Sequence, residues 1–156
     1  MKNAHQVHRG RRDALIAAMR RHSGGGLALL PTAAEAIRNR DSTYPYRHDS
    51  YFYYLSGFPE PEAVVALVAD AAGDRHVLFC REKNAEREIW DGFRYGPDAA
   101  KEIFGFDEAH PIGERRAGLL RACAGAVERL FHAFAETVED SHAVVLSQPD
   151  LRRARR

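Results

Sequence analysis

A continuous apolar run, AVVALVA at residues 63–69, constrains the fold of this 156-residue sequence more than any other feature. A run of β-branched and small side chains without polar alternation is typical of a strand that is covered on both faces. A second run, HVLFCR at 76–81, follows the segment DAAGD, in which Gly73 and Asp74 form a turn signal. The two runs therefore predict a β-hairpin whose first strand is buried on both faces.

Helices and strands are predicted in alternation around this hairpin. A helix at about 6–22 stops at SGGG, and the segment LALLP that follows predicts a short buried strand ended by Pro31. Residues 32–50 form a long polar connection, and a connection of this length in a compact domain is usually functional or partner-facing. The other predicted elements, in chain order, are a helix rather than a strand at 50–56 with Ser50 as N-cap, a loop at WDGFRYGP, a helix opened by Pro97, a long helix at about 114–136 and a strand at 143–146. This order predicts the α/β class, with a mixed β-sheet flanked by helices.

The composition excludes several classes of protein. Hydrophobic residues make up 45% of the chain and charged residues 29%, which fits one globular domain and excludes a disordered chain. No apolar run approaches the roughly 18 residues of a membrane-spanning helix. The net charge of +1 gives no reason to expect nucleic acid or an acidic membrane surface as partner.

Local charge and cysteine usage bear on location. The basic segment HRGRRDALIAAMRRH could be an Arg-rich transit peptide, but Leu15, Ala18 and Met19 make a helical stripe. A first helix with a solvated basic face is therefore the favoured interpretation. Cys80 and Cys123 fit buried thiols in a reducing compartment better than a disulfide framework, so a cytoplasmic location is expected.

Common catalytic motifs are absent from the sequence. It contains no phosphate-binding loop, no dinucleotide fingerprint, no H-E-x-x-H, no G-x-S-x-G and no C-x-x-C. The cluster Arg47, His48 and Asp49 could hold a metal or anchor a loop, and the loop anchor is favoured. Glu60 and Glu62, on either side of a proline, could imitate an acid/base pair, but solvated side chains in a turn are favoured.

Two features point to recognition rather than packing. Trp90, the sole tryptophan, lies in EIWDGFRYGP, and a tryptophan in a loop bounded by glycines is often a recognition surface, with simple packing as the alternative. The segment Tyr44-Pro45-Tyr46-Arg47 combines flat rings, a fixed bend and a guanidinium group. Such sets make interfaces, although a loop clamped onto its own domain is an equal alternative.

The segments DSTYPYRHDSYFYYLSGFPEPEAVVAL and EIWDGFRYGPDAA, preceded by the helix RRDALIAAM, resemble the N-terminal domain of Xaa-Pro aminopeptidases. This family includes aminopeptidase P, prolidase and creatinase, which carry a "pita-bread" metallopeptidase fold in a C-terminal domain. The resemblance covers about residues 9–110 well and the rest by element order. It implies a ribonuclease-H-like domain over residues 1–156. Because the family domain continues through another helix and strand, a piece truncated at its C-terminal end is favoured.

The resemblance also implies a function. Such enzymes remove the N-terminal residue from peptides whose second residue is proline, using two divalent ions, commonly manganese. The metal ligands belong to the C-terminal catalytic domain, and no position of this sequence matches one. The chain alone is therefore expected to hold no metal or catalytic residue and to be inactive, with the two Mn²⁺ ions in the missing domain.

Three residues and several partners follow from the same resemblance. Trp90 is expected to border the pocket for the substrate's proline, Asp41 to reach the catalytic cleft, including that of a neighbouring subunit, and Arg47 to support this loop. The expected partners are Xaa-Pro peptides, the catalytic domain and further copies in a homo-oligomer. The alternative is a stand-alone, non-catalytic module that binds peptides or proteins. Nucleic-acid binding is disfavoured, because the aromatic segment holds one arginine and no lysine.

Overall fold

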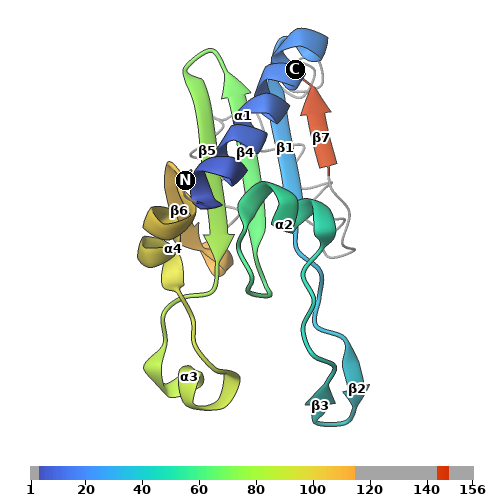
Figure 1. Ribbon diagram of the computed structural model, residues 1–156, viewed down its shortest axis with the longest axis vertical. Helices are drawn as coiled ribbons and strands as arrows, with labels where there is room; N and C mark the ends of the chain where they lie inside the picture. Colours follow the sequence, from blue (N-terminus) through green and yellow to red (C-terminus); the bar gives the residue numbers. More distant parts are fainter. Residues whose placement is uncertain (1–3, 115–143, 148–156) are drawn as a thin grey trace.

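A five-stranded sheet forms the body of the computed structural model, which describes residues 4–114 and 144–147 (Figure 1). Its strand order is β6-β5-β4-β1-β7. The strands are β1 (Gly26–Pro31), β4 (Val64–Asp70), β5 (Gly73–Cys80), β6 (Glu108–Pro111) and β7 (Val144–Ser147). β4 pairs antiparallel with β1 and with β5, β1 pairs antiparallel with β7, and β5 pairs parallel with β6. Because β5 and β6 are parallel while the other pairs of described strands are antiparallel, the sheet is mixed, which confirms the predicted fold class.

The predicted hairpin is the β4–β5 pair. Val64 lies opposite Phe79 at one end, and Asp70 lies opposite Gly73 at the turn. The Asp70 carboxylate closes this turn by accepting hydrogen bonds from the backbone N–H groups of Ala72 (2.8 Å) and Gly73 (3.2 Å). Every residue of the run 63–69 is buried, so both faces of β4 are covered as its composition predicted.

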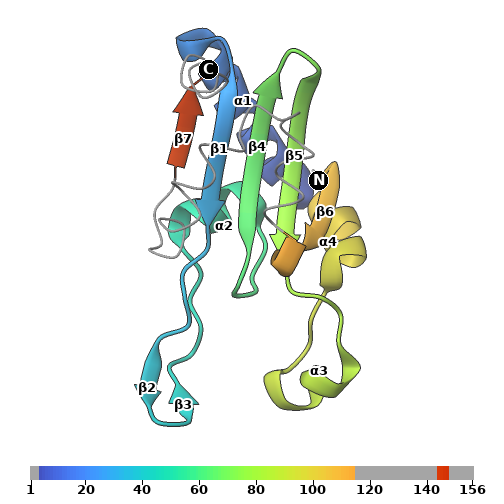
Figure 2. The same cartoon turned by 180° about the vertical axis from the view of Figure 1, so that it is seen from behind.

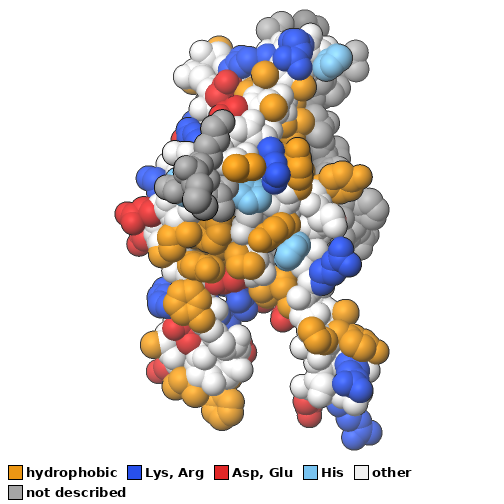
Figure 3. Space-filling view, in the orientation of Figure 1, with side chains coloured by type: hydrophobic (Ala, Val, Ile, Leu, Met, Phe, Trp, Pro, Cys, Tyr) orange, Lys and Arg blue, Asp and Glu red, His pale blue; other side chains and the backbone are white. Residues whose placement is uncertain are grey.

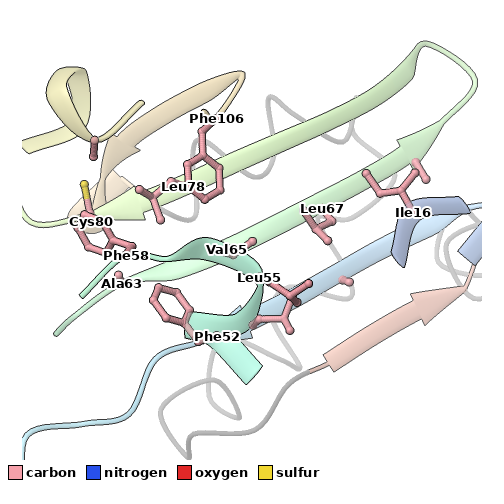
Figure 4. Packing of buried hydrophobic residues seen from close by; sticks show 14 of the residues in the cluster. Ile16, Phe52, Leu55, Phe58, Ala63, Val65, Leu67, Leu78, Cys80 and Phe106 are labelled. Atoms are coloured by element: carbon pink, nitrogen blue, oxygen red, sulfur yellow. The ribbon is translucent and has the colours of Figure 1, made fainter. Parts of the chain in front are cut away.

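Three helices pack against the hairpin and its neighbours: α1 (Ala4–Ser23), α2 (Ser50–Ser56) and α4 (Gly96–Phe104). α1 and α2 lie side by side on one face of the sheet (Figures 1 and 2). The hydrophobic core fills the space between these helices and the strands (Figure 4). Its labelled members include Ile16, Phe52, Leu55, Phe58, Val65, Leu67, Leu78 and Phe106. Each such side chain contributes about 1.5–3 kcal/mol by leaving water.

Arg12 of α1 is fully buried and joins the ends of two other helices. Its Nη1 donates to the carbonyl of Leu55 in α2 (2.9 Å), and its Nη2 donates to the carbonyls of Phe104 (3.2 Å) and Gly105 (2.6 Å) at the end of α4. Its Nε donates to Nδ1 of His76 in β5 (3.3 Å). The sequence predicted a solvated basic face for this helix, and Arg12 is the exception to that prediction.

The charge of Arg12 suits its surroundings. The carboxyl ends of two helices carry partial negative charge, which favours a cation beside them. The guanidinium carbon also lies 4.1 Å from the centre of the Phe106 ring. Burial, assisted by the nearby charge of Arg9, lowers the pKa of Arg12 to about 10. The group therefore remains charged at neutral pH, and its hydrogen bonds are charge-assisted.

His76 is buried between Arg12 and Asp13, and its hydrogen bonds fix a neutral ring. Since Nδ1 accepts from Arg12, the ring proton lies on Nε2, which is 3.2 Å from the Asp13 carboxylate. Burial is the main cause that lowers the pKa of His76, followed by the charge of Arg12, while the charges of Asp107 and Asp13 oppose both.

A pH dependence of stability follows for His76. Its pKa in the folded state lies below the ordinary 6.5, so its contribution is complete above about pH 6.5 and is lost as the pH falls through the folded-state value. We expect His76→Gln, whose side chain can still accept from Arg12, to weaken the decline of the urea midpoint between pH 7.5 and 5. The pKa of Asp107 is also lowered, because hydrogen bonds from the His76 amide and from Arg9 outweigh the opposing effect of burial. The stability that this carboxylate contributes is lost only below about pH 3.8, outside the range of the measurement. Equal declines of the urea midpoint in the unaltered chain and in His76→Gln would contradict the prediction.

Several sequence predictions need correction. The N-cap of α2 is Asp49, whose carboxylate accepts from the Phe52 N–H (2.8 Å), and not Ser50. The long polar connection contains a small hairpin, β2 (Ile37–Asn39) with β3 (Ser42–Thr43). The predicted loop around Trp90 begins inside a helix, α3 (Ala85–Asp91), and β6 and the short 3₁₀ helix Ile112–Glu114 were not predicted.

Other predictions are confirmed or lie outside the described residues. The helix at 6–22, the strands at 27–31 and 143–146, and the helix opened by Pro97 are present, each within a few residues of its predicted limits. Cys80 is buried as predicted, and burial raises the pKa of its thiol to about 12. The long helix at 114–136, with Cys123, lies beyond the described residues except for Glu114. Among the helices of the described ranges, none is long and apolar enough to cross a membrane.

Candidate functional site

Two arms extend from the same end of the sheet and carry the residues singled out from the sequence. The β2–β3 arm comprises residues 36–44, and the α3 arm comprises residues 82–95. Both views of the ribbon place them beyond the end of the sheet strands, on opposite sides of the molecule (Figures 1 and 2). The space-filling view shows two separate projections with an open gap between them (Figure 3). Such a gap can receive a partner or a substrate.

The β2–β3 arm presents polar and basic side chains. Asp41 lies at the turn between its two strands and is exposed, with no hydrogen bond or ion pair of its carboxylate within residues 4–114. The arm closes through a hydrogen bond from the Tyr44 N–H to the Ala36 carbonyl (2.9 Å). Ile37 and Tyr44 remain 74% and 54% exposed. The arginine side chains of this arm, Arg38 and Arg40, form a basic patch at its end (Figure 3).

The segment that follows the β2–β3 arm is anchored to its own domain. The Tyr46 hydroxyl lies 2.6 Å from Oγ1 of Thr32 and donates to the Ala33 carbonyl (3.2 Å), and burial raises the pKa of Tyr46. The His48 ring stacks on the Tyr53 ring with 3.9 Å between centres. The loop-anchor interpretation therefore holds for this half of the aromatic segment, whereas the Tyr44 half is exposed.

The metal interpretation of Arg47, His48 and Asp49 finds no support. Within the described ranges, no three His, Cys, Asp or Glu side chains form a group that could hold a metal ion. Asp49 caps α2, and His48 stacks on a tyrosine. Arg47 is exposed, and in the part of the chain that the structure describes its side chain makes no hydrogen bond or ion pair. Its supporting role therefore stays a prediction.

The α3 arm presents apolar side chains. Asn84 caps the helix by accepting a hydrogen bond from the Arg87 N–H (3.0 Å), and Gly92, with a φ of 80°, ends it. No residue of α3 is buried. Trp90 is 87% exposed, Ile89 78% and Phe93 64%. Simple packing therefore does not explain the sole tryptophan, and three large apolar side chains on one arm are typical of an interaction surface.

The base of the α3 arm is closed by a network of charges. The Lys83 ammonium donates to the Arg94 carbonyl (2.8 Å) and pairs with the Glu88 carboxylate (2.8 Å). The same carboxylate accepts from the Arg94 N–H (3.1 Å), and the Arg94 guanidinium pairs with Asp91. Lys83 also lies 4.2 Å from the centre of the Phe93 ring. These contacts join the segment that precedes α3 to the segment that follows it.

Glu60 holds this base to the sheet and is not the solvated side chain that the sequence favoured. It is 6% exposed, and its Oε1 accepts from the Tyr95 N–H (2.7 Å). Its Oε2 lies 3.5 Å from Nη2 of Arg81, at the end of β5. Glu62, in contrast, is exposed, as expected. Because Glu60 is buried and Glu62 is exposed to solvent, the two carboxylates do not share one site, which excludes a joint acid/base role.

A groove lies apart from the arms, between α1 and α2. Its volume is about 860 Å³. Its walls are largely apolar and include Val7, Leu15, Leu30, Tyr51 and Tyr54, with Arg11 at one side. None of the sequence-predicted site residues lines it.

Comparisons with known proteins identify the family to which the sequence is similar. Residues 8–131 match the family model of the aminopeptidase P N-terminal domain. The Xaa-Pro aminopeptidase of Escherichia coli is 41% identical over 127 residues, covering 81% of this chain and 28% of that protein. The Xaa-Pro aminopeptidase of Haemophilus influenzae is 38% identical over 104 residues, covering 67% of this chain and 24% of that protein.

Solved structures give the same result. Aminopeptidase P from E. coli with the inhibitor Pro-Leu superposes with a TM-score of 0.68 at 40% identity, over 76% of this chain and 26% of the other. The zinc-substituted E. coli enzyme in complex with product matches with the same score and coverage. The chain spans 28% of the length of the E. coli Xaa-Pro aminopeptidase and 24% of the length of the H. influenzae one. The chain belongs to the family of aminopeptidase P N-terminal domains.

Proposed function

We propose that this chain is the N-terminal, non-catalytic domain of a manganese-dependent Xaa-Pro aminopeptidase, in which it shapes the substrate cleft and makes oligomer contacts. The parent enzyme would remove the N-terminal residue of a peptide whose second residue is proline, in the cytoplasm. One observation carries the proposal: the sole tryptophan of the chain stands 87% exposed on an arm that is firmly held at its base. An indole exposed to this degree has nothing to pack against until a partner or substrate covers it.

The roles of the two arms follow from their chemistry. Trp90 offers a flat apolar face, against which the pyrrolidine ring of a substrate's proline can pack. Asp41 offers a free carboxylate at a hairpin tip, which suits a polar network across a cleft or a subunit boundary. Because the arms are separate, the cleft is completed only when a catalytic domain, or another subunit, lies against them.

The chemical step belongs to the other domain in this proposal. The proposal places both divalent ions and their ligands in the catalytic domain; among the described residues of this chain, no three His, Cys, Asp or Glu side chains form a group that could hold a metal ion. When bound in the catalytic domain, the two divalent ions supply an activated water and polarise the scissile carbonyl. The contribution of this chain is to orient the substrate and to exclude water from one side.

A direct prediction is that the isolated chain is inactive. We expect no hydrolysis of an Xaa-Pro peptide by residues 1–156 in the presence of Mn²⁺, and hydrolysis by the longer polypeptide that carries them. Release of the N-terminal amino acid measures both. Activity that follows the 17.5 kDa chain through two chromatographic steps would contradict the assignment.

A further inference from the structure

Glu60 connects the α3 arm to the body of the domain at both of its ends. Arg81, the residue before the arm, pairs with one carboxylate oxygen, and Tyr95, its last residue, donates its N–H to the other. All three residues lie at the same junction between the sheet and α4. A single buried carboxylate therefore touches the chain where it enters the arm and where it leaves it.

The local sequence holds Glu60 in this position. Pro59 and Pro61 stand on either side of it. The residue before a proline is confined to extended backbone, and proline itself has a fixed φ, so the backbone of this segment has few alternatives. Pro61 is buried, which fixes the segment against the domain.

The last residue of the arm is also held through its side chain. The Tyr95 ring packs edge-on against Phe104 (5.2 Å between centres), which lies against the core, and its centre is 6.0 Å from that of the core residue Phe58. It also contacts the Phe93 ring edge-on at 5.0 Å. Phe93 belongs to the arm, so ring contacts run from the core into the arm.

We propose that Glu60 is the positioning residue of the α3 arm, which sets where Trp90 stands relative to the body of the domain. The functional part of this inference rests on the role proposed for Trp90 above. The charge network around Lys83 closes the arm upon itself but does not tie it to the sheet. Glu60 supplies that second connection, because it joins the base of the arm to the end of β5.

Amide hydrogen exchange of the chain, followed by NMR, tests the connection itself. In Glu60→Ala we expect the Tyr95 and Arg94 amides to exchange about tenfold faster or more, while amides of β4 and β5 keep their rates. Glu60→Gln retains an acceptor for Tyr95 but loses the charge opposite Arg81, so a smaller acceleration is expected. Glu62→Gln, an exposed acidic neighbour, is the matched control and should change neither set.

Two outcomes of the exchange experiment would overturn the proposal. One is wild-type exchange of the arm amides in Glu60→Ala. The other is equal acceleration of arm and sheet amides, which would show a general loss of stability rather than release of the arm. If Glu60→Ala does not fold, the same two criteria apply to Glu60→Gln.

Kinetics of the longer, active polypeptide test the consequence for Trp90. We expect Glu60→Ala to lower kcat/KM for an Xaa-Pro peptide, and the double variant with Trp90→Ala to lose about as much as Trp90→Ala alone. Additive losses would show that Glu60 acts by another route. Unchanged kinetics of Trp90→Ala would contradict the role proposed for the tryptophan, whereas the exchange data would still decide whether Glu60 holds the arm.

Discussion

Replacing Arg12 by methionine is expected to lower the free energy of unfolding of the chain by about 3–5 kcal/mol. Methionine fills similar space but donates no hydrogen bond, so the carbonyls of Leu55, Phe104 and Gly105 would lose their donors. An unpaired buried polar group costs about 1–3 kcal/mol. Native domains are stable by about 5–15 kcal/mol, so this loss would remove a large share of the stability of the chain. Urea unfolding followed by circular dichroism measures the change.

Arg21→Met is the matched control for Arg12→Met. Arg21 lies on the same helix, is exposed and makes no hydrogen bond or ion pair within the described part of the chain. Its replacement should change the free energy of unfolding by less than about 0.5 kcal/mol. Arg12→Lys should restore little stability, because one ammonium group cannot reproduce the planar set of donors. Equal stabilities of Arg12→Met and Arg21→Met would show that Arg12 does not hold the three elements together.

Replacing Trp90 by alanine in the longer, active polypeptide is expected to lower kcat/KM for an Xaa-Pro peptide about ten- to a hundredfold. Burying an aromatic side chain is worth about 1.5–3 kcal/mol, and about 1.4 kcal/mol corresponds to a factor of ten in rate. Trp90→Phe should recover part of the loss, since a smaller ring still offers an apolar face. Bound metal should stay unchanged, which elemental analysis of the purified variants can measure.

The control for Trp90→Ala is Ile103→Ala, which removes an exposed apolar side chain from α4, outside the residues of both arms. Its kinetics should match the unaltered polypeptide. Equal kcat/KM values for Trp90→Ala and Ile103→Ala would remove Trp90 from the substrate cleft. A loss that comes with loss of metal would instead indicate a structural effect.

The parts of the fold that could be predicted are those whose side chains follow a regular pattern. The run at 63–69 is apolar on both faces, so it predicted a covered strand, and the turn residues predicted the hairpin. α3 has no buried face, so its apolar residues show no helical stripe, although Asn84 and Gly92 were usable cap signals. The small β2–β3 hairpin is also exposed, so its sequence shows no pattern of buried and exposed side chains from which it could have been predicted.

Residues whose burial depends on distant parts of the chain could not be predicted. Arg12 is charged and belongs to a basic helix, and it is buried only because two helix ends bring their carbonyls to it. Glu60 looked like half of a solvated pair, and it is buried because Tyr95 and Arg81 reach it from other elements. The exposure of Trp90 and Asp41 matched their predicted surface setting, whereas their placement on separate arms required the structure.

Intact mass spectrometry of the native polypeptide, captured from its own cells with an antibody against residues 1–156, tests the central claim most directly. The claim that this chain is one domain of an Xaa-Pro aminopeptidase predicts a mass well above 17.5 kDa. A native mass of 17.5 kDa would contradict it. The exposed apolar side chains of the α3 arm would then belong to a stand-alone module that binds a peptide or a protein partner.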